Sequence, residues 1–211
     1  MAEASIAYPA NLSIDYPDRE LNRFTTFFRL FTIIPILIIL ALLIGAANDG
    51  DANRGWNCQY AAIGFVVLPT VLMLLFRHKY PRWWFDWNVA LFKFCTRVWT
   101  YFALLRDEYP STDEEQAVHI EIPYPDAKTE LNRWLPLVKW FLAIPHYFVL
   151  CFVGIAAVVC VFVAWFAILF TGRYPRALFD FVVGTFRWSL RVTAYSFLLT
   201  TDQYPPFSLS E

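Results

Sequence analysis

Charge is scarce in this chain, and recognisable catalytic motifs are missing from it. Only 17% of the 211 residues are charged, whereas a water-soluble domain carries roughly 25%. Too few charged side chains are present to cover a soluble globule of this size. The chain also lacks a glycine-rich phosphate loop, an HExxH zinc motif and a GxSxG nucleophile motif. We therefore expect a non-enzymatic protein with no catalytic residue and no cofactor.

Metal-binding and redox patterns are equally sparse. The four cysteines form no CxxC pair and have no histidines nearby at metal spacing. His146 lies in an apolar run without a second histidine or carboxylate at helical spacing. A satisfied interhelical hydrogen bond is therefore favoured for His146 over proton or metal chemistry. The first residues lack a basic region followed by a short apolar stretch, so we expect no cleavable signal peptide.

What the chain does have is long apolar runs. Residues 30–47 and 58–76 are uncharged, and about 20 apolar residues cross a bilayer core of roughly 30 Å. Residues 140–171 are also uncharged, but as one straight helix they would reach about 48 Å. We predict a tight helical hairpin turning at Gly154, with one long kinked helix as the alternative. The predicted membrane spans are about 28–47, 58–76, 134–152 and 155–173.

The placement of cations predicts an orientation. Of the 17 Lys and Arg residues, only Arg54 falls in the loop between the first two spans. Cytoplasmic loops carry an excess of Lys and Arg. The chain should therefore cross the membrane four times with both termini in the cytoplasm.

The sequence repeats itself. KYPRWWFDWNVALFKFCTRVWTY (79–101) returns as RYPRALFDFVVGTFRWSLRVTAY (173–195), and YPDRELNRF (16–24) returns as YPDAKTELNRW (124–134). FRLFTIIP (28–35) returns as VKWFLAIP (138–145), which aligns Arg29 with Lys139 and Pro35 with Pro145. We predict two copies, 1–110 and 111–211, related by an axis along the membrane normal. The two prolines should kink their helices equivalently.

Each copy should hold a hairpin of two spans followed by an amphipathic helix, at about 82–105 and 176–200. The segments NLSIDYP (11–17) and VHIEIPYP (118–125) alternate apolar and polar residues, as half-exposed strands do. Their matching positions favour a small cytoplasmic β-pairing. The predicted fold class is thus an all-α integral membrane protein with a small strand pair.

Each amphipathic helix carries one polar stripe. Asp86, Lys93, Arg97 and Tyr101 are spaced by 7, 4 and 4 residues, which places them within roughly 80° on a helix. The second helix repeats the pattern with Asp180, Arg187, Arg191 and Tyr195, and Arg82 and Arg176 open the two helices.

Three interpretations of this stripe remain open. In the first, the helices lie along the cytoplasmic surface with their cations toward lipid phosphates. In the second, the helices pack against the spans, and their charges pair within the bundle or across a subunit interface. In the third, each stripe belongs to a further span that lines a polar path. The third would invert the second copy, which the cation distribution opposes.

The chain resembles a bacterial membrane-protein family catalogued as domain of unknown function 4389. IPHYFVL (144–150), the stretch 169–209 and the counterparts in 79–110 carry the resemblance. It implies a multi-pass protein of the bacterial inner membrane with no known activity. In the first copy, Lys93-Phe94 replaces an Arg-Trp pair and Arg77-His78 replaces Thr-Gly.

The leading hypothesis is a structural or accessory membrane protein. The ten stripe residues would contact lipid headgroups and partner subunits, either in a homo-oligomer or in a larger membrane complex. The runner-up is a component of an oligomeric transporter or channel for ions or small solutes. A membrane enzyme acting on lipid or quinone has no motif to support it, and nucleic-acid binding has no support because the cations line apolar segments.

Overall fold

Two helices of equal length form the middle layer of the fold. The computed structural model describes residues 8–17, 21–43, 67–111, 114 and 116–210. Within them, α4 spans Arg82–Phe102 and α7 spans Arg176–Ser196. Each begins directly after a proline in extended conformation, Pro81 or Pro175, because proline is tolerated at a helix start but not in its interior.

The apolar runs form a second layer of helices. Its members are α1 (Arg23–Thr32), α2 (Ile34–Leu43), the helix Val67–Arg77 with its π-helical end η1 (Met73–Arg77), η2 (Leu135–Leu137), α5 (Lys139–Leu142) and α6 (Ile144–Thr171). α6 packs along α7, α1 packs on α6, and α2 packs on α4.

Proline interrupts this layer at matching places. The chain bends by 47° between α1 and α2, where Pro35 is the second residue of α2. Pro145 stands at the same place in α6, directly after the break at Ala143. A proline removes a helical hydrogen bond and clashes with the preceding turn. A helix break thus precedes both prolines, as the alignment of the two copies predicts; the equivalence of the two kinks stays a prediction.

The predicted hairpin at Gly154 is wrong. α6 runs without interruption from Ile144 to Thr171 and passes straight through Gly154. One glycine costs a helix only about 1 kcal/mol, and no polar residues nearby could satisfy the backbone of a turn. The spans expected at 134–152 and 155–173 are replaced by one kinked helical path. Of the spans expected in the first copy, residues 44–66 lie outside the described part of the chain.

The predicted strand pairing is confirmed. β1 (Asn11–Ile14) and β2 (Val118–Glu121) form an antiparallel ribbon with Leu12 opposite Ile120. Leu12, Ile14, Val118 and Ile120 are buried, while the alternate side chains are exposed. The ribbon packs its apolar face on the middle layer, β1 against α7 and β2 against α4.

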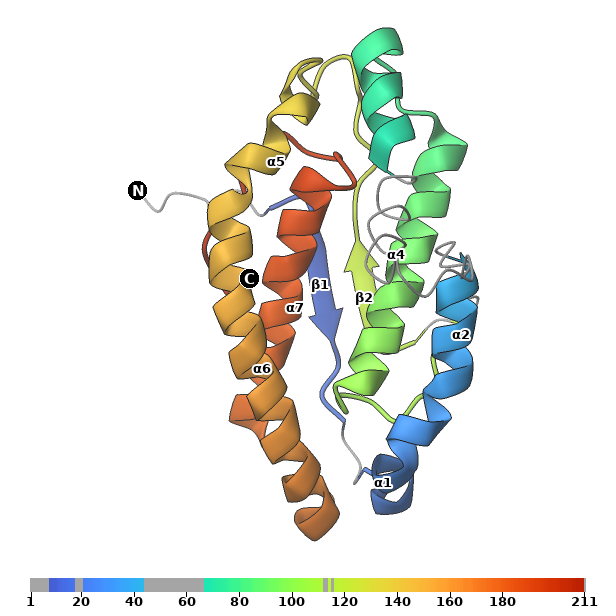
Figure 1. The fold of residues 1–211 in the computed structure, drawn as a ribbon, viewed down its shortest axis with the longest axis vertical. Helices are drawn as coiled ribbons and strands as arrows, with labels where there is room; N and C mark the ends of the chain where they lie inside the picture. Colours follow the sequence, from blue (N-terminus) through green and yellow to red (C-terminus); the bar gives the residue numbers. More distant parts are fainter. Residues whose placement is uncertain (1–7, 18–20, 44–66, 112–113, 115, 211) are drawn as a thin grey trace, which may run out of the picture.

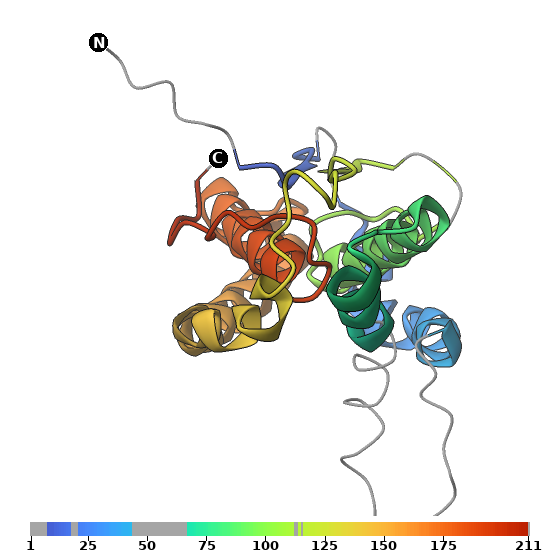
Figure 2. The ribbon, with the colours of Figure 1, turned by 90° about the horizontal axis from the view of Figure 1, so that it is seen from above.

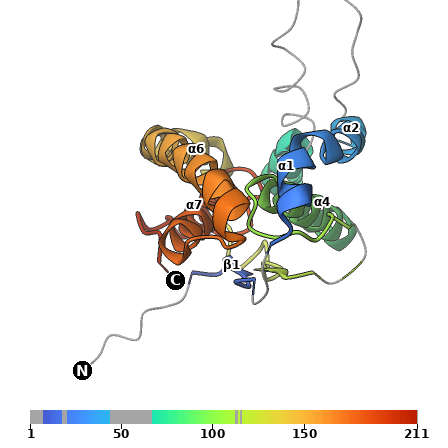
Figure 3. The ribbon, with the colours of Figure 1, turned by 90° about the horizontal axis from the view of Figure 1, so that it is seen from below.

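The described residues thus form three layers. Seen face-on, the long helices run roughly parallel to one another, and the ribbon lies beside their middle (Figure 1). Views from above and below place the ribbon on one side of α4 and α7, and α6, α1 and α2 on the other (Figures 2 and 3). The structure is therefore mostly helical with one small strand pair.

Among the described residues, only α6 is clearly long and apolar enough to cross a membrane. Its most apolar stretch is 11% buried within the protein. The bent pair α1–α2 meets the same criterion when it is counted as one span. In the part of the chain that the structure describes, four transmembrane helices are not seen.

Candidate functional site

A buried lysine anchors the segment that follows α7. Lys139, the first residue of α5, is fully buried. Its ammonium group lies 2.8 Å from the carboxylate of Asp202, donates to the carbonyl of Thr201 at 2.7 Å, and sits over the ring of Tyr195. Burial lowers the pKa of Lys139 below its ordinary value, and Asp202 opposes this shift by stabilising the charged form.

The first half of the chain contains the same arrangement with an arginine. Arg29 is 3% exposed, pairs with Asp107 and lies over the ring of Tyr101. Its guanidinium also donates to the carbonyls of Tyr101 and Arg106, at 2.8 and 2.7 Å. Asp107 also accepts from the backbone of Asn22, just as Asp202 accepts from the backbone of Asn132.

Sequence reasoning missed these two ion-pair clusters, although it aligned their cations. The cation distribution predicts only that Arg29 and Lys139 lie toward the cytoplasmic side. The available signal was that RDEYP (106–110) and TDQYP (201–205) place an aspartate at matching positions after each amphipathic helix. Opposite charges that recur together in two copies indicate a pair. In both halves this pair ties the apolar layer to the end of the middle layer.

The arginines of the α7 stripe donate mainly to backbone carbonyls. Arg191 is 4% exposed and donates to the carbonyls of Ser208 and Ser210, at 3.4 and 2.8 Å. Arg187 donates to the carbonyl of Leu12 at 3.0 Å. These contacts agree with the second interpretation of the stripe, in which its charges are paired within the protein.

The stripe of α4 is similar but more open. Arg97 is partly exposed and donates to the carbonyl of Ser111 at 2.8 Å, and Lys93 is also partly exposed. Tyr101 is buried, and its hydroxyl lies 2.8 Å from that of Thr32. Tyr195 is buried under Lys139 in the same way. Asp86 and Asp180 are exposed.

The arginines that open the two helices hold tyrosines from the opposite half. Arg176 lies over Tyr16, and the Tyr16 hydroxyl donates to the carbonyl of Tyr174 at 2.6 Å. Arg82 lies over Tyr124, and the Tyr124 hydroxyl donates to the carbonyl of Tyr80. Each turn before a middle-layer helix is thus closed by the other half of the chain.

His146 makes the interhelical contact that the sequence favoured. It is fully buried in α6, and its Nδ1 accepts from the indole of Trp188 in α7 at 3.3 Å. Its ring stacks on Phe207 with centroids 3.9 Å apart. Among the described residues, no group of three or more His, Cys, Asp or Glu is placed to hold a metal ion.

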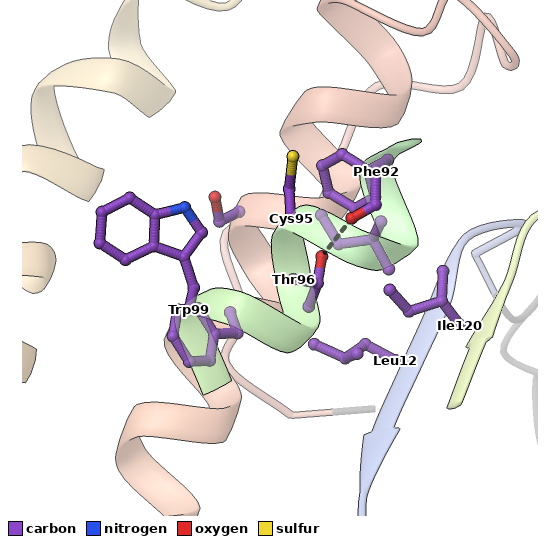
Figure 4. Close-up of a pocket in the computed structure, with 9 residues that line it drawn as sticks. Leu12, Phe92, Cys95, Thr96, Trp99 and Ile120 are labelled. Carbon is purple, nitrogen blue, oxygen red and sulfur yellow. Dashed lines mark hydrogen bonds between the residues drawn. The ribbon is translucent and has the colours of Figure 1, made fainter. Parts of the chain in front are cut away.

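A cavity of about 300 Å³ lies beneath the ribbon, between α4 and α7 (Figure 4). Equivalent residues of the two halves line it in pairs: Leu12 with Ile120, Phe92 with Phe186, Cys95 with Ser189, and Thr96 with Leu190. Trp99 completes the lining and is shared with a second, almost wholly apolar cavity of about 180 Å³ against α6. Both cavities could hold a small apolar group. Cys95 lines the first cavity, and its burial raises its pKa to about 11.

Comparison with known proteins adds one finding. Residues 134–208 match the family model described as Domain of unknown function (DUF4389). The match covers η2, α5, α6 and α7, together with the segment that closes the Lys139 cluster, and it finds one copy rather than the expected two. No curated protein and no solved structure matches the chain.

Proposed function

We propose that this chain is a non-enzymatic structural or accessory membrane protein, built from two copies of one unit, that binds lipids and partner subunits. The observation that carries the proposal is the exposure of the apolar layer. Phe148, Phe162 and Phe170 of α6 are 67%, 61% and 79% exposed. Exposed apolar surface of this extent is typical of membrane or protein contact.

The duplication itself has structural support. The ion-pair clusters of Arg29 and Lys139 have the same three kinds of partner, and α4 and α7 have the same length. A cavity lined by equivalent pairs is also expected where two copies meet. Both halves would therefore be versions of one unit, although the family model matches only the second.

Exposure divides the ten predicted contact residues into two groups. Arg82, Arg176, Asp86 and Asp180 are exposed, and we assign direct contact with headgroups or partner side chains to them. The others are half-buried or buried (Lys93, Arg97, Arg187, Arg191, Tyr101 and Tyr195). Those groups would hold the contact surface in place rather than form it.

We further propose the bacterial inner membrane as the location, with both termini cytoplasmic, and a homo-oligomer or larger membrane complex as the working form. The cation distribution and the family resemblance support this.

Native nanodiscs provide the test. The intact assembly would be extracted and weighed together with everything that co-purifies. Replacing Arg82 and Arg176 by glutamate should reduce the retention of anionic lipid or of partner subunits, whereas replacing both by lysine should not. A lone monomer carrying a stoichiometric small molecule, or a glutamate variant that retains lipid and partners like the wild type, would contradict the proposal.

A transport role is the second candidate, and the cavity between α4 and α7 is the observation that favours it. An oligomer could join such cavities into a path. Cysteines introduced along Asp86–Tyr101 would react with a water-soluble reagent on all faces if they lined a continuous aqueous path. Reaction confined to the outward face of α4 would leave the accessory role as the better explanation.

A further inference from the structure

The ribbon defines an internal two-fold axis. Aligning the Tyr-Pro-Asp turns at Tyr16 and Tyr124 makes Leu12 and Ile120 equivalent, and these two residues lie directly opposite each other in the ribbon. When equivalent residues of antiparallel strands face each other, the axis that relates the strands passes between them, perpendicular to the ribbon. The paired lining of the cavity and the exchanged contacts of Tyr16 and Tyr124 obey the same symmetry.

α6 runs across this axis. Figure 1 shows the ribbon face-on, so the axis points along the line of sight, while α6 runs lengthwise down the picture, perpendicular to that line. With 28 residues, α6 is about 42 Å long. The ribbon lies beside the N-terminal half of α6 rather than beyond its end.

An α6 that crossed the bilayer would therefore carry the ribbon to the same depth. The outward side chains of the ribbon, among them Asn11, Ser13, His119 and Glu121, would then enter the hydrocarbon. The outer edges of β1 and β2 would also be exposed to lipid, since the ribbon has two strands in the described part of the chain. Open sheet edges do not occur in the hydrocarbon region, and ionisable groups there are costly.

We infer that α6 does not cross the membrane but lies along the plane of one leaflet, with the internal axis along the membrane normal. This inference rests on the proposed membrane function and specifies its lipid partner. The layer of α1, α2, α5 and α6 is immersed at the headgroup–acyl boundary, α4 and α7 lie above it, and the ribbon faces the cytoplasm. A helix in this position has no upper limit on its length, which fits the 28 residues of α6.

The charges agree with an anionic leaflet. Exposed arginines flank the helices of the apolar layer: Arg23 opens α1, Arg77 ends the helix Val67–Arg77, Arg133 precedes η2, and Arg173 follows α6. Exposed carboxylates lie on the ribbon and its flanking segments, at Asp15, Glu108, Glu114 and Glu121, and also on α4, α7 and the segment before η2, at Asp86, Asp180, Asp126 and Glu130. The arginines at the ends of the apolar-layer helices are complementary to anionic lipid headgroups.

Polarised infrared spectroscopy of the whole protein in oriented bilayers tests this directly. The bilayers would be phosphatidylethanolamine with and without phosphatidylglycerol. Because α4, α6 and α7 run roughly parallel, the amide dichroism should place the helix axes in the membrane plane. Binding to vesicles should also be stronger when phosphatidylglycerol is present.

Depth measurements give a second readout. Spin labels would be placed singly at Ile144, Val158 and Phe170, which are 55%, 69% and 79% exposed, in a variant without other cysteines. The inference expects the same shallow depth at all three positions and full water access for a control label at Ser13. A deep Val158 between two shallow ends, with helix axes along the normal, would overturn the orientation while leaving the accessory membrane role intact. A soluble dimer that needs no lipid would overturn both, since a second copy would then cover the layer.

Discussion

Removing the carboxylate of Asp202 should destabilise the fold through Lys139. In an Asp202→Asn variant the ammonium group would stay fully buried but lose its ion-pair partner. Removing one partner of a buried pair costs about 3–5 kcal/mol. Asp202 is 21% exposed, and Lys139 keeps the Thr201 carbonyl and the Tyr195 ring. We therefore expect a loss of about 2–3 kcal/mol in the free energy of unfolding at neutral pH.

The loss should shrink as the pH rises. Burial already lowers the pKa of folded Lys139 below its ordinary 10.5, and Asp202 counteracts that shift. Without Asp202 the folded pKa falls further, so the unfolded chain binds more protons than the folded chain over a wider range below 10.5. Stability then increases with pH across that range. The free energy of unfolding of the variant should approach that of the wild type as the pH nears 10.5, because Lys139 is then mostly neutral in both folded proteins.

Unfolding in mild detergent by denaturant, followed by tryptophan fluorescence, measures both effects. Asp107→Asn is the matched control from the first half, because Arg29 retains two carbonyl acceptors there and does not lose its charge in this pH range. Its deficit should therefore stay constant with pH. Replacing both partners, as Lys139→Met with Asp202→Leu, should recover most of the stability. A deficit in Asp202→Asn below about 1 kcal/mol, or one that does not change with pH, would refute the reasoning.

Three further outcomes are expected. His146→Leu leaves the buried Trp188 indole without its acceptor and should cost about 1–3 kcal/mol with an altered tryptophan emission; an unchanged spectrum would contradict the contact. Cys95 should react slowly with a thiol reagent near neutral pH and should accelerate toward pH 11, because burial raises its pKa to about 11; a rate that does not rise with pH would contradict this. Fragments 1–110 and 111–211 should be unstable when expressed alone and should associate when co-expressed; stable separate fragments would contradict the interlocked fold.

The starts of the middle-layer helices and the ribbon are readable from sequence because they depend on local chemistry. Pro81 and Pro175 fix where α4 and α7 begin, and alternation around Leu12 and Ile120 marks the strands. Repetition also indicates that the two segments have the same role. Their antiparallel pairing then follows, because two copies related by a two-fold axis place equivalent strands side by side.

The hairpin at Gly154 failed for a physical reason. The prediction assumed that a helix cannot be longer than the bilayer is thick. That limit applies only if the helix stands along the membrane normal. The hydrogen-bond partners of the stripe cations could not be predicted from the sequence for another reason. Their partners on Leu12, Ser208 and Ser210 are backbone carbonyls, which every residue carries, so no sequence pattern distinguishes them.

The exchanged contacts predict that the matched segment 134–208 is not a complete folding unit by itself. α7 takes its ribbon partner from β1, α6 packs on α1, and the Tyr174 carbonyl is capped by Tyr16, all from the first half. A chain with a single copy of this unit would expose the same surfaces and could complete them only with a second chain across a two-fold axis, as isologous dimers do. In the proposed duplication, joining two copies in one chain would replace that association with an intramolecular one, which no longer depends on concentration. The two halves could then differ in sequence while the shared axis is kept, and they do so at the aligned pairs Arg29 and Lys139, and Cys95 and Ser189.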